Sequence, residues 1–441
     1  MMNLGRQPRR KLRVAAVILV LLTAAVRPLA WAQEKTGRPL TLEDCLLEAL
    51  KNNPLLAAAR YDLDIGLLRV TEARASLFPS LSLGSGLDHS SAVGRAGASG
   101  GSSSYGASLS ARATLFQGGK IAAAVDAARA ISRSSSHQYE SQVQDLVQNI
   151  TALYYRILQA GGLVGVAEQS IEQARFHRES AVARNEAGLG RRSDILKADV
   201  ELSAASLGLI RAVNARRSLE GSLNVLMGRE AQPRLVLADR EEAADITERL
   251  ELDQLLQASY SSRPEMKRME ALTEAQQADI RAARGARAPW ISADTSFSFA
   301  GSSSKSGQGN WSIGLSLSLP VFNGFALSSR LAQEEVALKS LDRQNQSERQ
   351  QISLDVWTAY LDLKEAEERI NNADTFLLNA RENLEIAEGE YREGVGSMIE
   401  VIDAQTALVA AEVNRIEART DYRIARSALK RAVGGFRFKE N

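Results

Sequence analysis

The chain has 441 residues, of which 44% are hydrophobic, 24% charged and 5% aromatic. Its 54 basic and 53 acidic side chains give a formal net charge of +1, so it lacks the positive excess typical of a nucleic-acid-binding protein. The single cysteine, Cys45, excludes an intrachain disulfide. Few aromatic residues and abundant alanine, serine and leucine favour long helices packed in thin layers.

Residues 1–32 have the three parts of a secretory signal peptide. A basic stretch precedes a short apolar run at 14–26, and Ala30-Trp31-Ala32 supplies a small-x-small cleavage site. The apolar run is short for a membrane anchor, which is the weaker alternative. Without this leader, 48 basic and 53 acidic residues remain, a net charge of −5 that again argues against a nucleic-acid partner.

The mature chain is predicted to contain two copies of one unit. Pro54 and Pro79 lie 25 residues apart in the first half, and Pro264 and Pro289 repeat this spacing in the second. Matched spacing of helix-breaking residues indicates a duplication. We assign the first repeat to 33–231, an equatorial linker to 232–250, the second repeat to 251–434 and a C-terminal tail to 435–441.

After the second proline of each pair, the apolar pattern changes to a period of two. It predicts a strand pair near 80–115 and another near 290–321, joined by Gly/Ser-rich loops at 84–106 and 300–310. Each strand has one apolar and one serine-rich face. The apolar face would cover a core in a soluble sheet but would face lipid in an outer-membrane barrel. Four strands cannot close a barrel, so we expect a dimer with eight strands or a trimer with twelve.

Two very long helical hairpins follow the strands, at 120–229 and 326–433. The first helix of each has about 68 residues and would span about 100 Å. Two shorter helices placed end to end would match that length, with strands at one end and glycine turns at the other. No other apolar run reaches the length of a membrane helix, and Gly161-Gly162 is a predicted bend. Two series have coiled-coil spacing: Ala373, Leu377, Ala380, Leu384, Ala387 and Tyr391, then Ile402, Thr406, Val409, Val413 and Ile416.

Both hairpins turn through the same motif. Residues 185–198 are N-E-A-G-L-G-R-R-S-D-I-L-K-A, and residues 391–404 are Y-R-E-G-V-G-S-M-I-E-V-I-D-A. Paired glycines allow the chain to reverse tightly, and an acid follows each pair in the next helix. We therefore predict a duplicated tip that carries the function. The matched residues are Gly188 with Gly394, Gly190 with Gly396, and Asp194 with Glu400.

Enzyme signatures are missing from the sequence. The three histidines, His89, His137 and His177, do not have metal-ligand spacing. Neither a phosphate loop nor a nucleophile elbow is present. We therefore predict no catalysis, no cofactor and no metal.

Four segments together resemble the TolC-type outer-membrane efflux protein family. They are L-T-L-E-D-C-L-L-E-A-L-K-N-N-P-L-L-A-A-A-R at 40–60, A-R-A-S-L-F-P-S-L-S-L at 73–83, L-S-L-S-L-P-V-F-N-G at 315–324, and the second tip. The resemblance covers nearly the whole mature chain. It implies a mainly α fold in which long helical hairpins form a trimeric α-barrel in the periplasm, joined to a 12-stranded β-barrel with four strands per chain in outer-membrane lipid. It also implies a passive channel for efflux or type I secretion, opened by a periplasmic adaptor and an inner-membrane transporter of the RND or ABC type.

The resemblance also implies roles for individual tip residues. Two acids of the second tip form rings at the periplasmic constriction in this family, and here they are Glu400 and Asp403. Such rings favour cations, although acids in the first turns of a helix also stabilise it by capping. Asp194 and Tyr391 match a family pair that helps to hold the tips closed, with the Tyr hydroxyl donating to the carboxylate.

One tip position departs from the family pattern. Well-known members have an arginine two residues after the second-tip glycine, where this chain has Gly396. Arg191 and Arg192 of the first tip are candidate replacements. The tip glycines, including Gly188, Gly190 and Gly394, would contact the adaptor.

Two other interpretations stay open from the residues alone. One is a secreted, soluble coiled-coil protein with a small β-domain. The other is a secreted pore-former that acts on the membrane of another cell.

Overall fold

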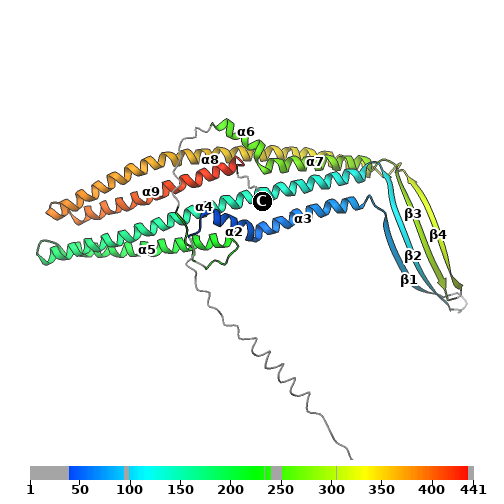
Figure 1. Cartoon of the computed structure of the whole chain (residues 1–441), viewed down its shortest axis with the longest axis horizontal. Coiled ribbons are helices and arrows are strands. Elements are labelled where there is room, and N and C mark those ends of the chain that lie inside the picture. The colour runs from blue at the N-terminus through cyan, green and yellow to red at the C-terminus, as the bar shows by residue number, and fades with distance from the viewer. Residues whose placement is uncertain (1–38, 94–98, 233, 240–250, 304, 436–441) are drawn as a thin grey trace, which may run out of the picture.

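The computed structural model describes residues 39–93, 99–232, 234–239, 251–303 and 305–435. Long helices form an elongated body, and a four-stranded sheet extends from one end of it (Figure 1). The predicted signal peptide, and most of the predicted linker and tail, lie outside the described residues. In chain order the elements are α2 (Leu42–Asn52), α3 (Pro54–Ala75), β1 (Ser80–Val93), β2 (Ser99–Gln117), α4 (Lys120–Glu186), α5 (Arg192–Leu226), α6 (Leu252–Ser262), α7 (Pro264–Gly285), β3 (Trp290–Ser302), β4 (Lys305–Ser318), α8 (Ala326–Glu393) and α9 (Met398–Ala432).

Capping residues and prolines set the ends of the short helices. α2 begins with a capping box, in which the Asp44 N–H donates to Thr41 Oγ1 at 3.2 Å and the Thr41 N–H donates to Asp44 Oδ2 at 3.0 Å. Asn53 ends α2 and caps α3, because its Oδ1 accepts a hydrogen bond from the Leu56 N–H at 2.9 Å. Pro54 then occupies the first turn of α3, where no N–H donor is needed, and Pro264 does the same for α7.

The four strands form one antiparallel sheet in the order β1-β2-β3-β4. The predicted strand pairs are confirmed, but the predicted loops at 84–106 and 300–310 are wrong, because most of these residues are strand. β1 extends to Val93, and β4 begins at Lys305. Glycine and serine have low strand propensity. The backbone hydrogen bonds of a ladder do not depend on side chains, so pairing continues past them.

The sheet separates apolar from serine side chains, as the period of two predicted. Leu83, Leu109, Phe297 and Trp311 stand opposite one another across the four strands. All four are exposed, Leu83 by 79%. Such a face is unfavourable in water and suits a lipid environment. The adjacent row, on the other face, consists of Ser82, Ser110, Ser296 and Ser312.

The two long helices, α4 with 67 residues and α8 with 68, are confirmed as the longest elements of the described chain. α5 packs beside the far half of α4, and α3 packs beside the half nearer the sheet (Figure 1). Asn53 Nδ2 donates to Leu226 O at 2.8 Å, so the end of α5 meets the start of α3. A Ser262 hydroxyl bond to Val433 O joins α6 and the end of α9 in the second repeat. The predicted end-to-end arrangement of short helices is therefore present in both repeats.

One of the two predicted coiled-coil seams is correct. The α8 series from Ala373 to Tyr391 is buried, whereas the predicted α9 series is not the buried one. The two α9 series are displaced by one or two residues and have similar spacing, so spacing alone does not decide which faces α8. The buried α9 residues of this cluster are Met398, Val401, Ala404, Leu408 and Ala411.

The glycine pair in α4 does not interrupt the helix. α4 is continuous through Gly161 and Gly162. A Cβ at Gly162 would lie 3.2 Å from Ile416 Cδ1, so this glycine makes room for α9. The predicted bend is replaced by a close helix contact.

α4 is also more apolar than the sequence inspection suggested. It contains an 18-residue window with mean hydropathy 1.2, long and apolar enough by composition to cross a membrane. The expectation that no such segment follows the leader is therefore wrong. α4 packs against α3, α5, α7 and α9, and a helix in contact on several sides needs apolar residues on each of them.

The junction of short helices in the first repeat is mainly apolar, with an ion pair between Arg229 and Glu48 of α2 beside it. Cys45 of α2, Ile150 of α4 and Leu223 of α5 are fully buried in one cluster. The described linker residues join it, because Leu235 belongs to the cluster and Leu237 forms a parallel bridge with Leu40. This part of the linker therefore covers the meeting point of α3 and α5.

The corresponding junction of the second repeat combines an apolar cluster around Val356 and Leu429 with buried charges. Arg431 of α9 is 8% exposed, donates through Nε to Asp145 Oδ1 of α4 at 2.9 Å and contacts Glu265 of α7. Arg263 contacts Glu265 as well and donates through Nη1 to Asp355 Oδ2 of α8 at 2.9 Å. The network therefore ties four helices together. In the first repeat, 206 residues earlier, Val225 corresponds to Arg431 and Asn149 to Asp355.

Replacing Glu265 by Gln should destabilise the protein by about 3 kcal/mol, because buried Arg431 loses the more buried of its two carboxylate partners. Burial opposes ionisation of Glu265, but hydrogen bonds and charges from Arg431 and Arg263 outweigh it and lower its pKa to about 2. Its stabilising contribution is present above its ordinary pKa of 4.5 and is lost as pH falls through about 2. Heat denaturation in detergent, followed by circular dichroism across that pH range, measures both effects.

Glu274→Gln is the matched control, since Glu274 also joins α7 to α4 through Arg133 but is 52% exposed. An exposed pair contributes at most about 1 kcal/mol. Equal losses in the two variants would contradict a special role for the buried network.

Candidate functional site at the helical tips

The two hairpin turns lie together at the end of the body opposite the sheet (Figure 1). The first connects α4 to α5 and the second connects α8 to α9. The tip residues singled out in the sequence belong to these turns or to the helix turns beside them. The structure therefore brings the two copies of the motif to the same end of the molecule.

Gly188 and Gly394 end the long helices in the left-handed conformation, with φ of 74° and 80°. The next N–H in each tip reaches back five residues to a helical carbonyl, Leu189 to Arg184 O at 2.8 Å and Val395 to Glu390 O at 3.0 Å. Other residues adopt this φ only with strain, which explains the glycine at each helix end.

At the second glycine of each tip there is no room for a side chain. A Cβ on Gly190 would lie 2.9 Å from Asn185 N, and one on Gly396 would lie 3.0 Å from Glu390 Cβ. Between each glycine pair stands an apolar residue that points to solvent: Leu189 is 75% exposed and Val395 81% exposed. The tip residues predicted from the sequence include the glycines but not these two side chains.

Glu400 and Asp403 lie on the exposed side of the first turns of α9. Glu400 forms a capping box with Ser397, because the Ser397 N–H donates to Glu400 Oε2 at 2.7 Å. The capping role foreseen as an alternative is thus present for Glu400. Asp403 has no hydrogen bond or ion pair to any residue in the described part of this chain. Spacing of i and i+3 keeps both carboxylates on one helix face.

Tyr391 and Asp194 are near each other but are not bonded within one chain. The Tyr391 hydroxyl is buried and has no hydrogen-bond partner among the described residues. Burial raises the pKa of Tyr391 and the charge of Asp194 raises it further, which shows that the carboxylate is close. Asp194 itself contacts Ser193 Oγ at 3.4 Å and Lys197 Nζ at 3.8 Å.

The contact between the tips is made by Arg184, which the sequence analysis missed. Its guanidinium lies over the Tyr391 ring, 4.9 Å from the centroid, and Nη1 donates to Arg392 O at 3.0 Å. A cation over an aromatic face is attracted to it, and a cation at a helix C-terminus is stabilised by the last carbonyls. A basic residue in the last turn of α4 was the only sequence signal for this contact.

Arg191 and Arg192 are exposed and form no ion pair with a residue in the described ranges. Within one chain they do not occupy the place of the arginine that the family pattern has at Gly396. The cation beside Gly394 is Arg184: a Cβ on that glycine would lie 3.4 Å from Arg184 Nη2.

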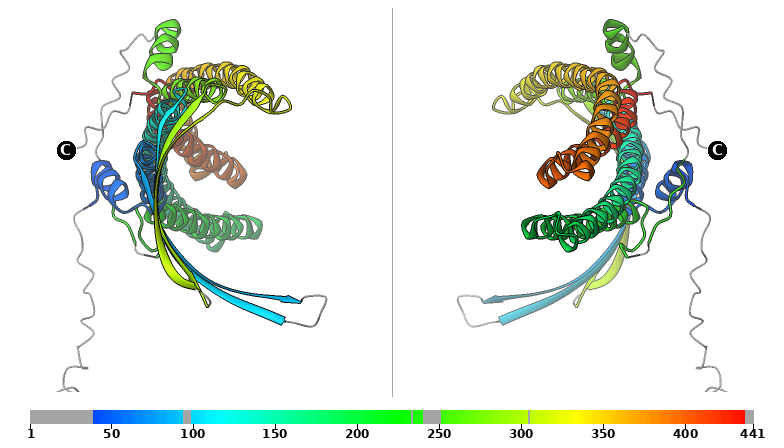
Figure 2. Two further views of the ribbon diagram at one scale, coloured as in Figure 1. Left: turned by 90° about the vertical axis from the view of Figure 1, so that its right-hand side faces the viewer. Right: turned by 90° about the vertical axis from the view of Figure 1, so that its left-hand side faces the viewer.

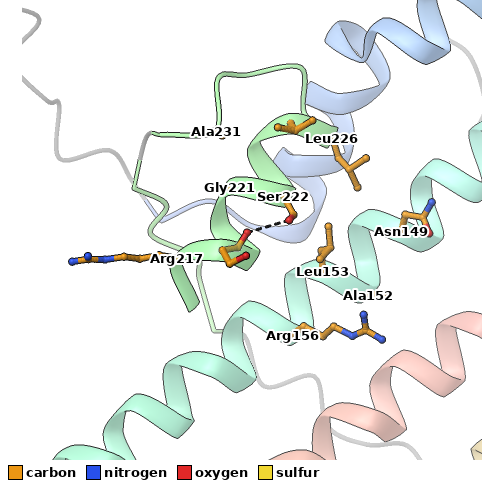
Figure 3. Close-up of a pocket in the computed structure, with 11 residues that line it drawn as sticks. Asn149, Ala152, Leu153, Arg156, Arg217, Gly221, Ser222, Leu226 and Ala231 are labelled. Carbon is orange, nitrogen blue, oxygen red and sulfur yellow. Dashed lines mark hydrogen bonds between the residues drawn. The ribbon is translucent and has the colours of Figure 1, made fainter. Parts of the chain in front are cut away.

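A groove of about 730 Å³ runs between α4 and α5, closer to the helix junction, and Figure 3 shows its lining residues, among them Asn149, Arg156, Arg217 and Ser222. Among the described residues, no group of three or more His, Cys, Asp or Glu side chains is placed to hold a metal ion. The chemistry available at the tips is therefore that of exposed carboxylates, one bridging arginine and two exposed apolar side chains.

Comparison with known proteins agrees with this geometry. The model of the family described as outer membrane efflux protein matches residues 46–229 and 255–435. Protein CyaE of Bordetella pertussis is 28% identical over 408 residues, covering 90% of this chain and 84% of the relative. Outer membrane protein TolC of Escherichia coli is 26% identical over 412 residues, covering 88% of this chain and 80% of the relative.

Solved structures have the same fold. The structure of CusC covers 90% of this chain and 92% of its own, with a TM-score of 0.79 and 20% identity. The open state of the Neisseria gonorrhoeae MtrE outer membrane channel covers 89% of each chain, with a TM-score of 0.75 and 21% identity. The family model matches well over half of the sequence. The chain therefore belongs to the outer membrane efflux protein family and is a TolC-type outer-membrane channel of efflux or secretion systems.

Proposed function

We propose that three copies of the chain close into a passive conduit with a twelve-stranded β-barrel in the outer membrane and a helical barrel in the periplasm. The observation that carries this proposal is the four-stranded sheet, which has an exposed apolar face and is open at both edges. β1 and β4 each pair on one side only within the described chain. Open, apolar strand edges are normally paired or covered, and twelve strands from three copies would pair all of them.

The helical body supports the same assembly. Figure 2 shows the hairpins arranged as a curved wall that is continuous with the sheet, with α2 and α6 outside the curve. Leu55, Tyr61 and Leu68 on α3 are each at least 67% exposed, and Val336 and Leu378 on α8 are each at least 62% exposed. Apolar residues along both borders of a curved wall would be buried by neighbouring copies.

The tips are the proposed gate. In a threefold assembly Glu400 and Asp403 would each form a ring of three carboxylates, which favours cations at a constriction. Arg184, Tyr391 and Asp194 would hold the two hairpins of one chain together in the closed state, in place of the arginine missing at Gly396.

Partners would open the gate from the periplasm. We assign the exposed Leu189 and Val395, with the glycines on either side, to contact with a periplasmic adaptor, because exposed apolar side chains on rigid turns are typical of contact sites. An inner-membrane transporter of the RND or ABC type would supply the energy. The relatives are channel proteins rather than enzymes, and the proposed conduit carries out no catalysis.

The assembly can be tested on the full-length protein. After membrane fractionation, it should be extracted from outer membranes only with detergent, and native mass spectrometry should show three copies. A soluble monomer would instead support a secreted coiled-coil protein. Recovery of the protein from the culture medium, with insertion into added vesicles, would support a pore-former that acts on another membrane.

Replacing both acids, Glu400→Gln with Asp403→Asn, should reduce cation selectivity, because six negative charges would leave the constriction of the trimer. Reversal potentials in planar bilayers under a salt gradient measure this change. Ser397→Ala is the control, since it removes the helix cap and keeps both charges. If the control and the double variant have the same selectivity as the unmodified protein, the acids serve only as helix caps.

Replacing Arg184 by Ala should weaken closure by about 2 kcal/mol, the sum expected for a cation over an aromatic ring and a charged hydrogen bond. Asp194→Ala should have a smaller effect, because Asp194 forms no hydrogen bond to Tyr391. Single-channel conductance and uptake of a large antibiotic report the leak. A larger leak in Asp194→Ala than in Arg184→Ala would contradict this order.

A further inference from the structure

A buried histidine links the two hairpins about three turns before the first tip. His177 of α4 is 3% exposed, with Nδ1 3.2 Å from Glu201 Oε1 of α5 and Nε2 3.5 Å from Glu388 Oε1 of α8. Glu201 belongs to the first hairpin and Glu388 to the second. The imidazole is therefore placed between carboxylates of the two units that must separate when the tips open.

Two other charged groups nearby, Arg178 and Asp199, are paired with each other. Arg178, the residue after His177 on α4, has its Nε 2.6 Å from Oδ1 of Asp199. Asp199 lies two residues before Glu201 on α5. From α9, the uncharged Gln405 hydrogen-bonds Gln173, one turn before His177. The charges that act on the His177 ring are therefore those of Glu201 and Glu388.

The cluster is not a product of the duplication. The positions 206 residues away from His177 and Glu201 are Asn383 and Ala407, and Val182 corresponds to Glu388. A structural requirement common to both hairpins would be expected in both copies. The single occurrence, at the contact between the hairpins, points to a role in that contact.

A shared metal ion does not explain the arrangement. The two carboxylates approach opposite ring nitrogens, so no single ion could contact the ring and both acids. Among the described residues, no metal-binding group of three is present. Protonation is the remaining chemistry that uses both contacts.

We propose that His177 is a pH-dependent link between the two hairpins, closed when its ring is protonated. An imidazolium donates through both nitrogens and can bind Glu201 and Glu388 together. A neutral ring has one N–H, so it can serve one carboxylate while its lone pair faces the other. Loss of the proton therefore removes the bridge and favours separation of α8 from the first hairpin. The proposal rests on the proposed gating at the tips.

The direction of the pH effect follows from the surroundings. Burial lowers the pKa of His177, but the hydrogen bond to Glu201 and the charges of Glu201 and Glu388 outweigh it, so the pKa is raised above 6.5. The link is therefore fully formed below the ordinary histidine pKa and is lost as pH rises through the raised value.

The link can be tested by nuclear magnetic resonance of the histidine rings in the detergent-solubilised channel. The chain has only two other histidines, so His89→Asn with His137→Asn leaves one ring signal. We expect this signal to titrate above the ordinary pKa, and we expect Glu388→Gln to lower that pKa. Titration at or below the ordinary value, unchanged by Glu388→Gln, would overturn the proposal.

Single-channel recording tests the consequence. In the unmodified channel, open probability should rise several-fold as the tip side is taken from about pH 5 to about pH 9, the range in which histidine titrates. His177→Asn should abolish this dependence, whereas His137→Asn should keep it, because His137 pairs with Glu140 of its own helix. An equal pH response in the two variants would overturn the link. If no variant conducts at all, the proposed channel function fails, and the ring titration still decides the link.

Discussion

The structure depends on the packing of two continuous helices, α4 and α8, against shorter helices along their whole length. The helices touch along narrow seams and not around a broad core. In the α8–α9 hairpin, small and large apolar residues alternate in one buried seam: Ala380, Leu384, Ala387, Leu408 and Ala411. Small side chains let the helices approach closely, and leucines fill the spaces between them. A wall of this kind has no central core, so much of its apolar surface stays outside each chain and is available for contact with other copies.

Duplication explains the framework but not the two junctions. Both junctions contain an apolar cluster, around Ile150 and Leu223 in the first repeat and around Val356 and Leu429 in the second, and the second adds the buried ion network of Arg431 and Glu265. An apolar junction tolerates small shifts, because dispersion contacts have little directional preference. A buried ion network is directional, and its loss leaves unpaired charge. The two copies therefore differ in what fixes them, although their helices have the same arrangement.

The two copies of the repeat also differ near the tips. Glycines fix both turns in nearly identical geometry, yet the groups that join the hairpins occur once each: Arg184 on the Tyr391 ring, and His177 between Glu201 and Glu388. A gate needs two states of similar free energy. Polar contacts between otherwise apolar hairpins provide such a balance, because partner binding or protonation can change them without disturbing the seams within each hairpin.

The sequence by itself determined the elements whose signals are local. Prolines and caps predicted where helices begin, period-two serine patterns predicted the strands, and paired glycines predicted the tips, since each signal acts through neighbouring backbone. The length of the strands was underestimated, because ladder pairing of Gly/Ser segments depends on the partner strand. Only the tertiary structure decided which α9 series faces α8, that Gly162 accommodates Ile416, and that Arg184 rather than Asp194 contacts Tyr391. These choices depend on the rotation of one helix against another, and spacing along a single helix does not contain that information.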